Sequence, residues 1–488
     1  MGSCSREMTG FFLFIIFFTV IASSWGHGNP GGTKFELIHR HHLERKPATQ
    51  IQRLRQLLHS DTIRLPEISH KVRLRQGHFD ASRRQLPEET AYYPACTNSS
   101  RRSKNDNNVS GEMPMHSGAD YGTGQYFVRF RVGSPAQKLM LIADTGSDLT
   151  WMNCKYRCRG GRCRKSSNKG RVFLADHSSS FRTVHCSSSM CKIDLANLFS
   201  LARCPSPMDP CAYDYRYSDG SAALGLFANE MVTFTLTNRR KTRLRNVLVG
   251  CSESTRGQSF QGADGVMGLG YSDYSFAVKA AKRFGGKFSY CLVDHLSPEN
   301  VSSYLIFGSH KEVGITYRRM RYTELLLGVI TPFYAVKIKG ISIGGLMLDI
   351  PPETWNLTGQ GGAIIDSGSS LTGLTQKAYQ PVMAALKLSL LNFKNLNLDI
   401  GPLEYCFNST GFNESVVPRL VFHFEDGARF EPPVKSYVID AAPAVKCLGF
   451  VPLSWPGASV IGNIMQQNHL WEFDLANSRL GFATSSCI

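Results

Sequence analysis

The chain of 488 residues lacks several features that would each place it in a particular class of protein. It has no apolar run of 18 residues, which excludes a transmembrane helix. Its 44 glycines and 22 prolines follow no three-residue period, which excludes a collagen-like rod. Charged residues make up 19% and apolar residues 42%, a balance that excludes global disorder. The length allows about three domains at roughly 150 residues each.

Acidic residues are scarce as well. Against 55 Lys and Arg there are 38 Asp and Glu, so the formal charge is +17. Either a basic segment that is later removed or an acidic partner would explain this excess.

A short apolar run lies near the N-terminus. Phe11 to Ala22 is twelve residues long with only Thr19 polar, which suits the core of a signal peptide and is too short to cross a bilayer. We expect residues 1–26 to be a signal peptide that leads to the secretory pathway, and from there to the apoplast or the vacuole. A chloroplast transit peptide is the alternative for the final compartment, and a buried N-terminal strand is the structural alternative.

The cysteine content agrees with secretion. Cys4 and Cys96 stand apart, and the other twelve form an even set that suits six disulfides in an oxidising compartment: Cys154, Cys158, Cys163, Cys186, Cys191, Cys204, Cys211, Cys251, Cys291, Cys406, Cys447 and Cys487. The first three of this set cluster as a metal site would, but too few His residues lie nearby to favour zinc. We expect neither a metal nor a cofactor. Six N-x-S/T sequons predict glycosylation: Asn98, Asn108, Asn300, Asn356, Asn408 and Asn413.

The chain changes character near residue 120. Residues 27–118 hold 15 Lys and Arg, 9 Asp and Glu, and eight of the 14 His, which is typical of a basic propeptide. Apolar residues at helical spacing predict an amphipathic helix near 48–60, and the polar stretch 83–118 predicts an exposed, cleavable linker. A basic tail without an inhibitory role is the alternative. Because His gains charge between about pH 7 and 5, we expect acid to loosen this segment.

Short β-rich runs separated by turn residues follow residue 120 and predict an all-β body. The runs with the clearest alternation are Gln125–Val132, Met231–Leu236 and, with a break at Gly340, Val336–Ile343. Two helices are expected around Ser275–Phe284 and Gln376–Leu388.

One motif occurs twice, 222 residues apart. Residues 139–147 read LMLIADTGS and residues 362–369 read GAIIDSGS, so each copy is an apolar strand that ends in Asp, a hydroxyl residue, Gly and Ser. A second element also repeats, GVMG at 265–268 and SVIG at 459–462. The body is therefore predicted to contain two copies of one β unit that face each other.

This symmetry would bring Asp144 and Asp366 together. Gly146 and Gly368 permit tight turns, and four hydroxyl residues can orient the carboxylates: Thr145, Ser147, Ser367 and Ser369. Two adjacent carboxylates share one proton, so one can deprotonate a water while the other protonates an amide carbonyl. Two unrelated Asx turns are the structural alternative.

These residues resemble the pepsin-like aspartic proteases, in particular their plant, nepenthesin-like branch. The resemblance runs from about residue 120 to the C-terminus and rests on DTGSDLTW (144–151), YDYRYSDGS (213–221), FSYC (288–291) and IGNIMQQNHLWEFD (461–474), with FELIHR (35–40) in the prosegment. It implies a bilobal all-β fold with a central cleft and a few short helices. It also implies an aspartic endopeptidase made as a zymogen, with polypeptide substrates and a monomeric state.

The resemblance implies further boundaries and roles. The N-terminal lobe would span 119–325 and the C-terminal lobe 326–488. Tyr217 matches the flap tyrosine, and Trp151 the aromatic residue that supports it. The second motif reads DSGSS where the family has DSGTS, but Ser369 keeps the hydroxyl. The implied disulfides are Cys154–Cys158, Cys163–Cys251, Cys186–Cys211, Cys191–Cys204, Cys291–Cys487 and Cys406–Cys447.

Two other functions stay open. Some plant members of this fold inhibit cell-wall glycosidases, but they typically lose a catalytic Asp. Seven Lys and Arg residues between 157 and 171 make an acidic polysaccharide a candidate partner, with a merely solvated loop as the alternative. Secretion and the lack of a recognition module argue against nucleic acid as a partner.

Overall fold

The computed structural model describes residues 55, 58, 61–73, 111–117, 124–157, 171–196, 204–295 except 237, 258 and 261, 303–309, 317 and 319–487. All of these residues belong to one unit, Glu44–Ile488. Within this part of the chain, no helix is long and apolar enough to cross a membrane.

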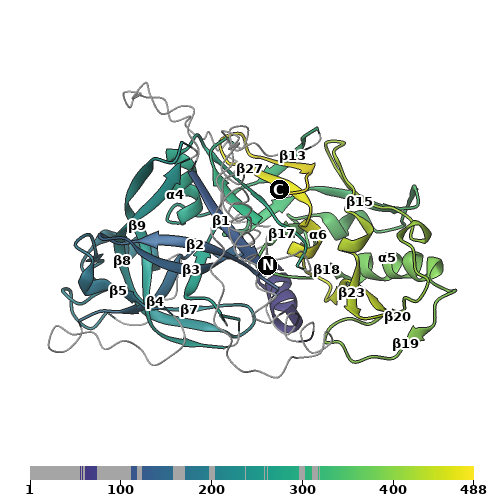
Figure 1. The fold of residues 1–488 in the computed structure, drawn as a ribbon, viewed down its shortest axis with the longest axis horizontal. Coiled ribbons are helices and arrows are strands. Elements are labelled where there is room, and N and C mark those ends of the chain that lie inside the picture. Colours follow the sequence, from purple (N-terminus) through teal and green to yellow (C-terminus); the bar gives the residue numbers. More distant parts are fainter. Residues whose placement is uncertain are drawn as a thin grey trace, which may run out of the picture. The chain divides into compact units, whose positions relative to one another are not determined.

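In its described residues, the N-terminal lobe contains twelve strands and one α-helix. In chain order they are β1 (Gly111–Ser117), β2 (Tyr126–Val132), β3 (Gln137–Asp144), β4 (Trp151–Lys155), β5 (Phe173–Leu174), β6 (Arg182–Thr183), β7 (Ala212–Arg216), β8 (Ala222–Leu236), β9 (Lys241–Arg256), β10 (Gly265–Gly268), α4 (Phe276–Arg283), β11 (Lys287–Cys291) and β12 (Ser303–Phe307). Figure 1 shows β2, β3, β8 and β9 side by side.

The C-terminal lobe contains the remaining strands and two further α-helices. They are β13 (Arg321–Leu326), β14 (Tyr334–Val336), β15 (Ile338–Ile343), β16 (Leu346–Met347), β17 (Ala363–Ile365), β18 (Thr372–Thr375), α5 (Gln376–Ser389), β19 (Asn395–Leu396), β20 (Cys406–Asn408), β21 (Leu420–Phe424), β22 (Arg429–Phe430), β23 (Val438–Ala442), β24 (Val445–Leu448), β25 (Phe450–Leu453), β26 (Ser459–Ile461), α6 (Asn463–Gln466), β27 (His469–Asp474) and β28 (Arg479–Thr484). The all-β class and both expected helices are confirmed.

The two lobes repeat one strand arrangement around the Asp motifs. β3, which ends at Asp144, pairs in parallel with β10. β17, which precedes Asp366, pairs in parallel with β26 in the same way. The repeat seen in the sequence is therefore a structural repeat, and each lobe presents its Asp at the end of a buried parallel strand.

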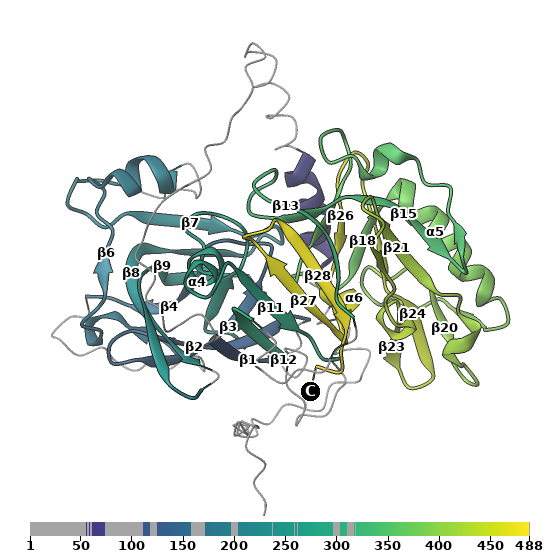
Figure 2. The same cartoon turned by 90° about the horizontal axis from the view of Figure 1, so that it is seen from above.

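Six consecutive antiparallel strands of the large sheet join the lobes, in the order β1-β12-β11-β27-β28-β13. Figure 2 shows β27 and β28, in yellow, beside β11 and β12. β1 also pairs with β2, so it is an integral strand of the body. The prediction of an exposed linker over 83–118 is therefore wrong for residues 111–117.

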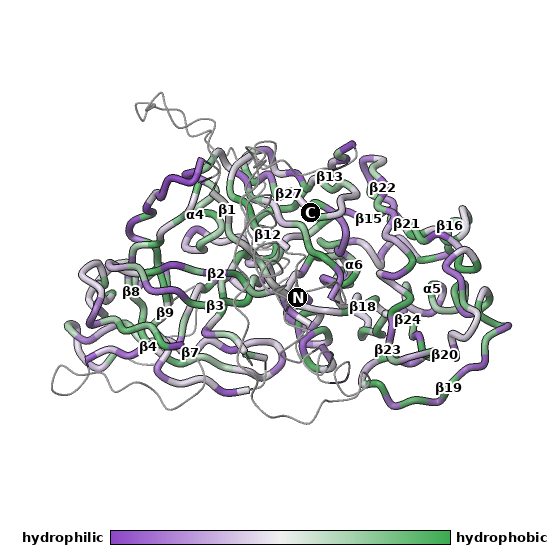
Figure 3. Tube along the Cα trace, in the orientation of Figure 1, coloured by the Kyte–Doolittle hydropathy of each residue, from purple (hydrophilic) through white to green (hydrophobic). Residues whose placement is uncertain are grey.

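Apolar residues are interspersed with polar ones along the strands of both lobes (Figure 3). In the N-terminal lobe the ring of Phe276 on α4 packs against Phe130, Phe234 and Phe307, at centroid distances of 5.4, 5.7 and 5.5 Å. Each such ring contributes about 1.5–3 kcal/mol by burial. The Oγ of Ser275 accepts the Val278 N–H at 3.2 Å and caps this helix.

Five disulfides lie within the described residues. Cys291–Cys487 and Cys406–Cys447 form as the family implies. The other implied pairs that can be compared are wrong, because the structure contains Cys154–Cys251, Cys186–Cys204 and Cys191–Cys211. Cys158 and Cys163 lie outside the described residues.

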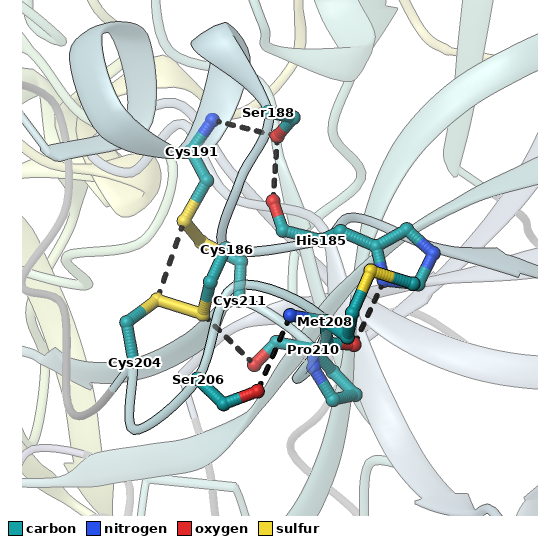
Figure 4. The surroundings of a disulfide bond; sticks show 9 residues. All are labelled: His185, Cys186, Ser188, Cys191, Cys204, Ser206, Met208, Pro210 and Cys211. Carbon is teal, nitrogen blue, oxygen red and sulfur yellow. Dashed lines mark hydrogen bonds between the residues drawn. A yellow bond between two sulfur atoms is a disulfide. The ribbon is translucent and has the colours of Figure 1, made fainter.

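Figure 4 shows why sequence spacing did not decide the pairing of four of these cysteines. The sulfurs of Cys191 and Cys204, which belong to different disulfides, are 3.7 Å apart. Both pairings therefore fit the same small space. The sulfurs of Cys186, Cys191 and Cys204 are close enough together to hold a metal ion, but each is bonded in a disulfide and offers no thiolate.

Candidate active site

The two Asp loops are joined by a symmetric set of hydrogen bonds. The Thr145 N–H donates to Ser367 Oγ at 3.1 Å, and the Ser367 N–H donates to Thr145 Oγ1 at 2.8 Å. Ser367 Oγ donates in turn to the Ala143 carbonyl at 3.0 Å. All of these groups are buried, so water does not compete for the hydrogen bonds between the lobes. The loops are thereby held at a fixed separation.

Each carboxylate is held by its own loop in the same way. Ser147 Oγ donates to Asp144 Oδ2 at 2.6 Å, and the Gly146 N–H donates to Oδ1 at 3.0 Å. Ser369 Oγ and the Gly368 N–H make the equivalent bonds to Asp366, at 2.6 and 2.9 Å. The hydroxyl residues therefore lie where the motif predicted them.

The close approach of the loops explains the two glycines. A Cβ on Gly146 would lie 2.8 Å from Asp366 Oδ1, and a Cβ on Gly368 would collide with Asp144 Oδ1. Each glycine therefore leaves room for the carboxylate of the opposite lobe. This contact across the lobes brings Asp144 and Asp366 together, as the sequence repeat predicted.

An arginine from the region that we predicted to be a propeptide lies between the two carboxylates. Arg64 Nη2 lies 2.7 Å from Asp144 Oδ1 and 3.1 Å from Asp366 Oδ2. Arg64 Nε donates to Ser369 Oγ at 3.1 Å. The side chain of Arg64 is 6% exposed, so this ion pair is withdrawn from water. Sequence reasoning did not single out this residue.

Arg64 belongs to a helix over residues 61–73, which Figure 1 shows in purple beside β18. Of the helix that we predicted near 48–60, only residues 55 and 58 are described, and both are helical; the prediction did not include the helix over 61–73. Its buried face consists of Leu58, Leu65, Ile68 and Val72. These side chains pack with C-terminal-lobe residues that include Leu371, Ile400 and Val451. Their spacing of three, four and seven residues was a signal available in the sequence.

A carboxylate of the same helix, that of Asp61, anchors it to the C-terminal lobe. Asp61 Oδ2 accepts the N–H groups of Ser370 and Leu371 at 2.8 and 2.6 Å, directly after the second Asp motif. Burial raises the pKa of Asp61 to about 7, although these N–H bonds and Arg64 lower it. Asp61 Oδ1 is buried without a hydrogen-bond partner in the described part of the chain, so the ionised form is poorly compensated.

The charges in the site shift one another. Burial raises the pKa of Asp144; Arg64 opposes this shift and the Asp366 carboxylate adds to it. Burial by itself would lower the pKa of Arg64, but Asp144 and Asp366 raise it above its ordinary value. Arg64 therefore stays charged, and with it in place the two carboxylates form a cation-bridged pair.

The hairpin of β7 and β8 carries Tyr217 over the site. Residues 217–221 form its turn, in which the Tyr217 N–H donates to the Ser221 carbonyl at 2.8 Å. Trp151 Nε1 donates to Tyr217 Oη at 2.6 Å, which is the support that the resemblance implied. Burial raises the pKa of Tyr217 well above its ordinary value, and the Asp144 carboxylate raises it further. Tyr217 is therefore a neutral hydroxyl.

Residues of the run 461–474 support the second Asp loop from behind. Gln466 Nε2 donates to the Asp366 carbonyl at 3.2 Å, and Asn463 Nδ2 donates to the Ser367 carbonyl at 3.0 Å. Tyr290 Oη donates to Gln466 Oε1, and His295 Nε2 bonds Asn463 Oδ1 at 3.2 Å. Sequence reasoning used this run for resemblance and did not assign it this positioning role.

The comparisons with known proteins agree with this geometry. Two family models match, described as xylanase inhibitor N-terminal over residues 126–309 and xylanase inhibitor C-terminal over 333–484. "Aspartyl protease family protein 2" of Arabidopsis thaliana is 34% identical over 440 residues, 85% of each chain. The chain belongs to the plant family of pepsin-like aspartic proteases.

Other members place the chain in the predicted branch of this family. "Aspartic proteinase nepenthesin-1" of Nepenthes gracilis is 31% identical over 386 residues, which cover 78% of this chain and 82% of nepenthesin-1. Among solved structures, basic 7S globulin from soybean aligns with a TM-score of 0.60 at 20% identity, over 78% of this chain and 95% of that one. The structure titled "edgp" aligns with a TM-score of 0.62 at 20% identity, with the same coverage. These two likenesses show the pepsin-like bilobal fold.

Proposed function

We propose that the chain is the latent precursor of an aspartic endopeptidase that hydrolyses peptide bonds with a water activated between Asp144 and Asp366. The observation that carries this proposal is the symmetric pair of carboxylates, each held by its own serine hydroxyl and glycine N–H. In the released enzyme the two would share one proton, so one carboxylate takes a proton from water while the other donates to the carbonyl oxygen.

Arg64 supports the latent state. Its guanidinium lies on both carboxylates, in the place where the shared water and the substrate carbonyl would have to be. Substrate hydrolysis then requires that the helix over 61–73 leave the cleft. The Tyr217 hydroxyl, held by Trp151, would close over the bound peptide.

The disulfides and the exposed sequons bear on the localisation and the glycosylation of the protein. Five disulfides support folding in an oxidising compartment, and we propose secretion, or delivery to the vacuole, after removal of residues 1–26. Asn356, Asn408 and Asn413 are exposed, which supports their glycosylation. Asn98, Asn108, Asn300 and most of the basic run 157–171 lie outside the described residues. Only the two ends of that run, Arg157 and Arg171, are described, and both are exposed.

The decisive test is peptide cleavage by the purified, acid-treated protein between pH 3 and 8, with and without pepstatin. We expect pepstatin-sensitive cleavage that disappears in Asp144→Asn and in Asp366→Asn. Asp349→Asn is a control for the loss of one carboxylate, because Asp349 is exposed and lies outside the Asp loops and the hairpin. Cleavage that persists in both dyad variants contradicts the mechanism.

A second candidate function comes from the printed name of the matching family models, xylanase inhibitor. Absence of cleavage by a correctly processed, disulfide-intact protein, together with inhibition of a xylanase, would favour this function. Retention of both Asp residues and the flap tyrosine favours the protease.

A further inference from the structure

The solvent face of the N-terminal sheet carries an array of cations. Side chains alternate along a strand, so the buried Val128, Phe130 and Val132 of β2 leave Arg131 on the opposite face. Arg131 stands directly opposite Lys138 of β3. The same alternation exposes three further cations on β9, and we call the whole set the basic face: Arg131, Lys138, Lys241, Arg243 and Arg245.

The strand register makes the basic face continuous. Val132 of β2 pairs with Val232 of β8, and the next residue of β8, Thr233, stands opposite Arg243. Thr235 stands opposite Lys241. Neighbouring strands lie about 4.8 Å apart, and residues on one face of a strand repeat about every 7 Å. The cations therefore form a two-dimensional array interspersed with threonine hydroxyls.

No ion pair within the described residues neutralises the basic face. On the C-terminal lobe, by contrast, Lys337, Lys377 and Lys446 pair with carboxylates at 2.9, 2.8 and 2.6 Å. The sequence supplies no acidic residue over 126–143 or 231–252, the stretches that build most of this sheet face. The positive charge is thus concentrated on one surface.

Like charges crowd at one edge of this surface. Burial lowers the pKa of Arg129, and the neighbouring Arg171 and Arg131 lower it further. Protection of an exposed strand edge accounts for cations on β9, where residues 241–246 pair with β8 alone among the described strands. It does not account for Arg131, because β2 pairs with β3 at this residue and with β8 at the next one, Val132.

We propose that the basic face binds an acidic polysaccharide, a polymer that carries one carboxylate on a sugar ring at regular intervals. A flat array of cations fits a row of carboxylates, and Thr233 and Thr235 supply hydroxyls for the sugar hydroxyl groups. The face offers no exposed aromatic side chain among its described residues on which a nucleic-acid base could stack. The disulfides support secretion, which favours a polysaccharide over a nucleic acid as the polyanion that the protein meets. This binding is independent of peptide cleavage.

The test is retention of the full-length protein on immobilised polygalacturonate, with neutral dextran as the blank. The test variant is Lys241→Gln/Arg243→Gln/Arg245→Gln. The control variant, Lys192→Gln/Lys339→Gln/Lys394→Gln, removes the same charge from exposed positions elsewhere. Affinity of the unaltered protein should fall steeply with salt. For nucleic acids each contact contributes about 0.7–0.9 to the slope of log affinity against log salt, so three lost contacts should lower the slope by about two.

We expect the test variant to bind polygalacturonate at least tenfold more weakly than the control variant, with both keeping the melting temperature and the peptide cleavage of the unaltered protein. Equal weakening in both variants would mean that net charge alone drives retention, and would overturn the proposal. Stronger binding to duplex DNA than to polygalacturonate would overturn the choice of partner. A test variant that melts at lower temperature is replaced by Arg131→Gln/Lys138→Gln, for which the same tenfold loss is expected.

Discussion

Replacement of Arg64 by methionine should activate the uncleaved precursor. Methionine keeps the length and apolar stem of the arginine but removes the cation that bridges Asp144 and Asp366. Loss of one partner of a buried ion pair costs about 3–5 kcal/mol. The lower half of this range applies here, because the two carboxylates can share a proton once the guanidinium is absent. The four buried apolar residues of the helix still hold it with about 1.5–3 kcal/mol each.

A loss of about 3 kcal/mol corresponds to roughly a 100-fold larger fraction of precursor with an open cleft. The assay is the initial rate of cleavage of a short fluorogenic peptide at pH 6, with intact precursor verified by gel at each time point. Arg73→Met is the matched control, because Arg73 is exposed on the same helix. We expect a rate increase of about 100-fold for Arg64→Met and none for the control. If Arg64→Met stays as inactive as the unaltered precursor, while the acid-treated form is active, latency does not depend on this ion pair.

Three further predictions follow from the site and the fold. In the docked helix the pKa of Asp61 is about 7, against an ordinary value of 3.8. The contribution of Asp61 to docking is therefore fully present below about pH 4 and is lost as the pH rises to 7. Asp61→Asn should remove this pH dependence from the latency of the precursor, and an unchanged pH profile would contradict the prediction. Trp151→Phe removes the 2.6 Å bond to Tyr217 and should lower kcat/KM about tenfold, with no additional loss in the double variant with Tyr217→Phe. The double replacement Cys406→Ser/Cys447→Ser opens a loop with a sequence separation of 41 and should lower the free energy of unfolding by about 4 kcal/mol in denaturant titrations, whereas a loss under 1 kcal/mol would refute the loop-closure argument.

The behaviour of Asp61 also revises the expected acid trigger. The sequence suggested that charging of the prosegment histidines loosens the segment. Of these residues only His70 has a described side chain, and it is exposed on the helix. Asp61 itself favours docking as the pH falls. We propose that protonation of the two dyad carboxylates, which would end their attraction to Arg64, contributes to release of the helix in acid.

The two Asp loops were predictable because the residues that shape them are local and repeated. An apolar strand followed by Asp, hydroxyl, Gly and Ser fixes the turn, and two copies fix the symmetry, so Asp144, Asp366 and their hydroxyl partners were located from the sequence alone. Arg64 was not, because one arginine among the 15 Lys and Arg of residues 27–118 carries no local signal. Its role arises only from the helix that places it across more than 300 residues of chain from Asp366.

The disulfides also differ in how far the sequence could predict them. Cys291–Cys487 and Cys406–Cys447 follow from strands whose partners are fixed by the fold, since Cys406 stands opposite Cys447 in the β20–β24 pair. In the cysteine-rich region four sulfurs share one small space, and exact loop conformation decides between the pairings. The cysteine spacing typical of the family does not determine that loop conformation.

The position of β1 sets a limit on where the chain can be cut. Gly111–Ser117 is a paired strand of the large sheet, with β12 on one side and β2 on the other. Cleavage after residue 118 would leave this strand as a separate peptide, tied to the enzyme only by sheet hydrogen bonds and two buried methionines, Met113 and Met115. Cleavage before Gly111 would leave it part of the mature chain. The first residue of the mature protein thus decides whether the active form is one polypeptide or a non-covalent complex of two, and N-terminal sequencing of the acid-treated protein distinguishes them.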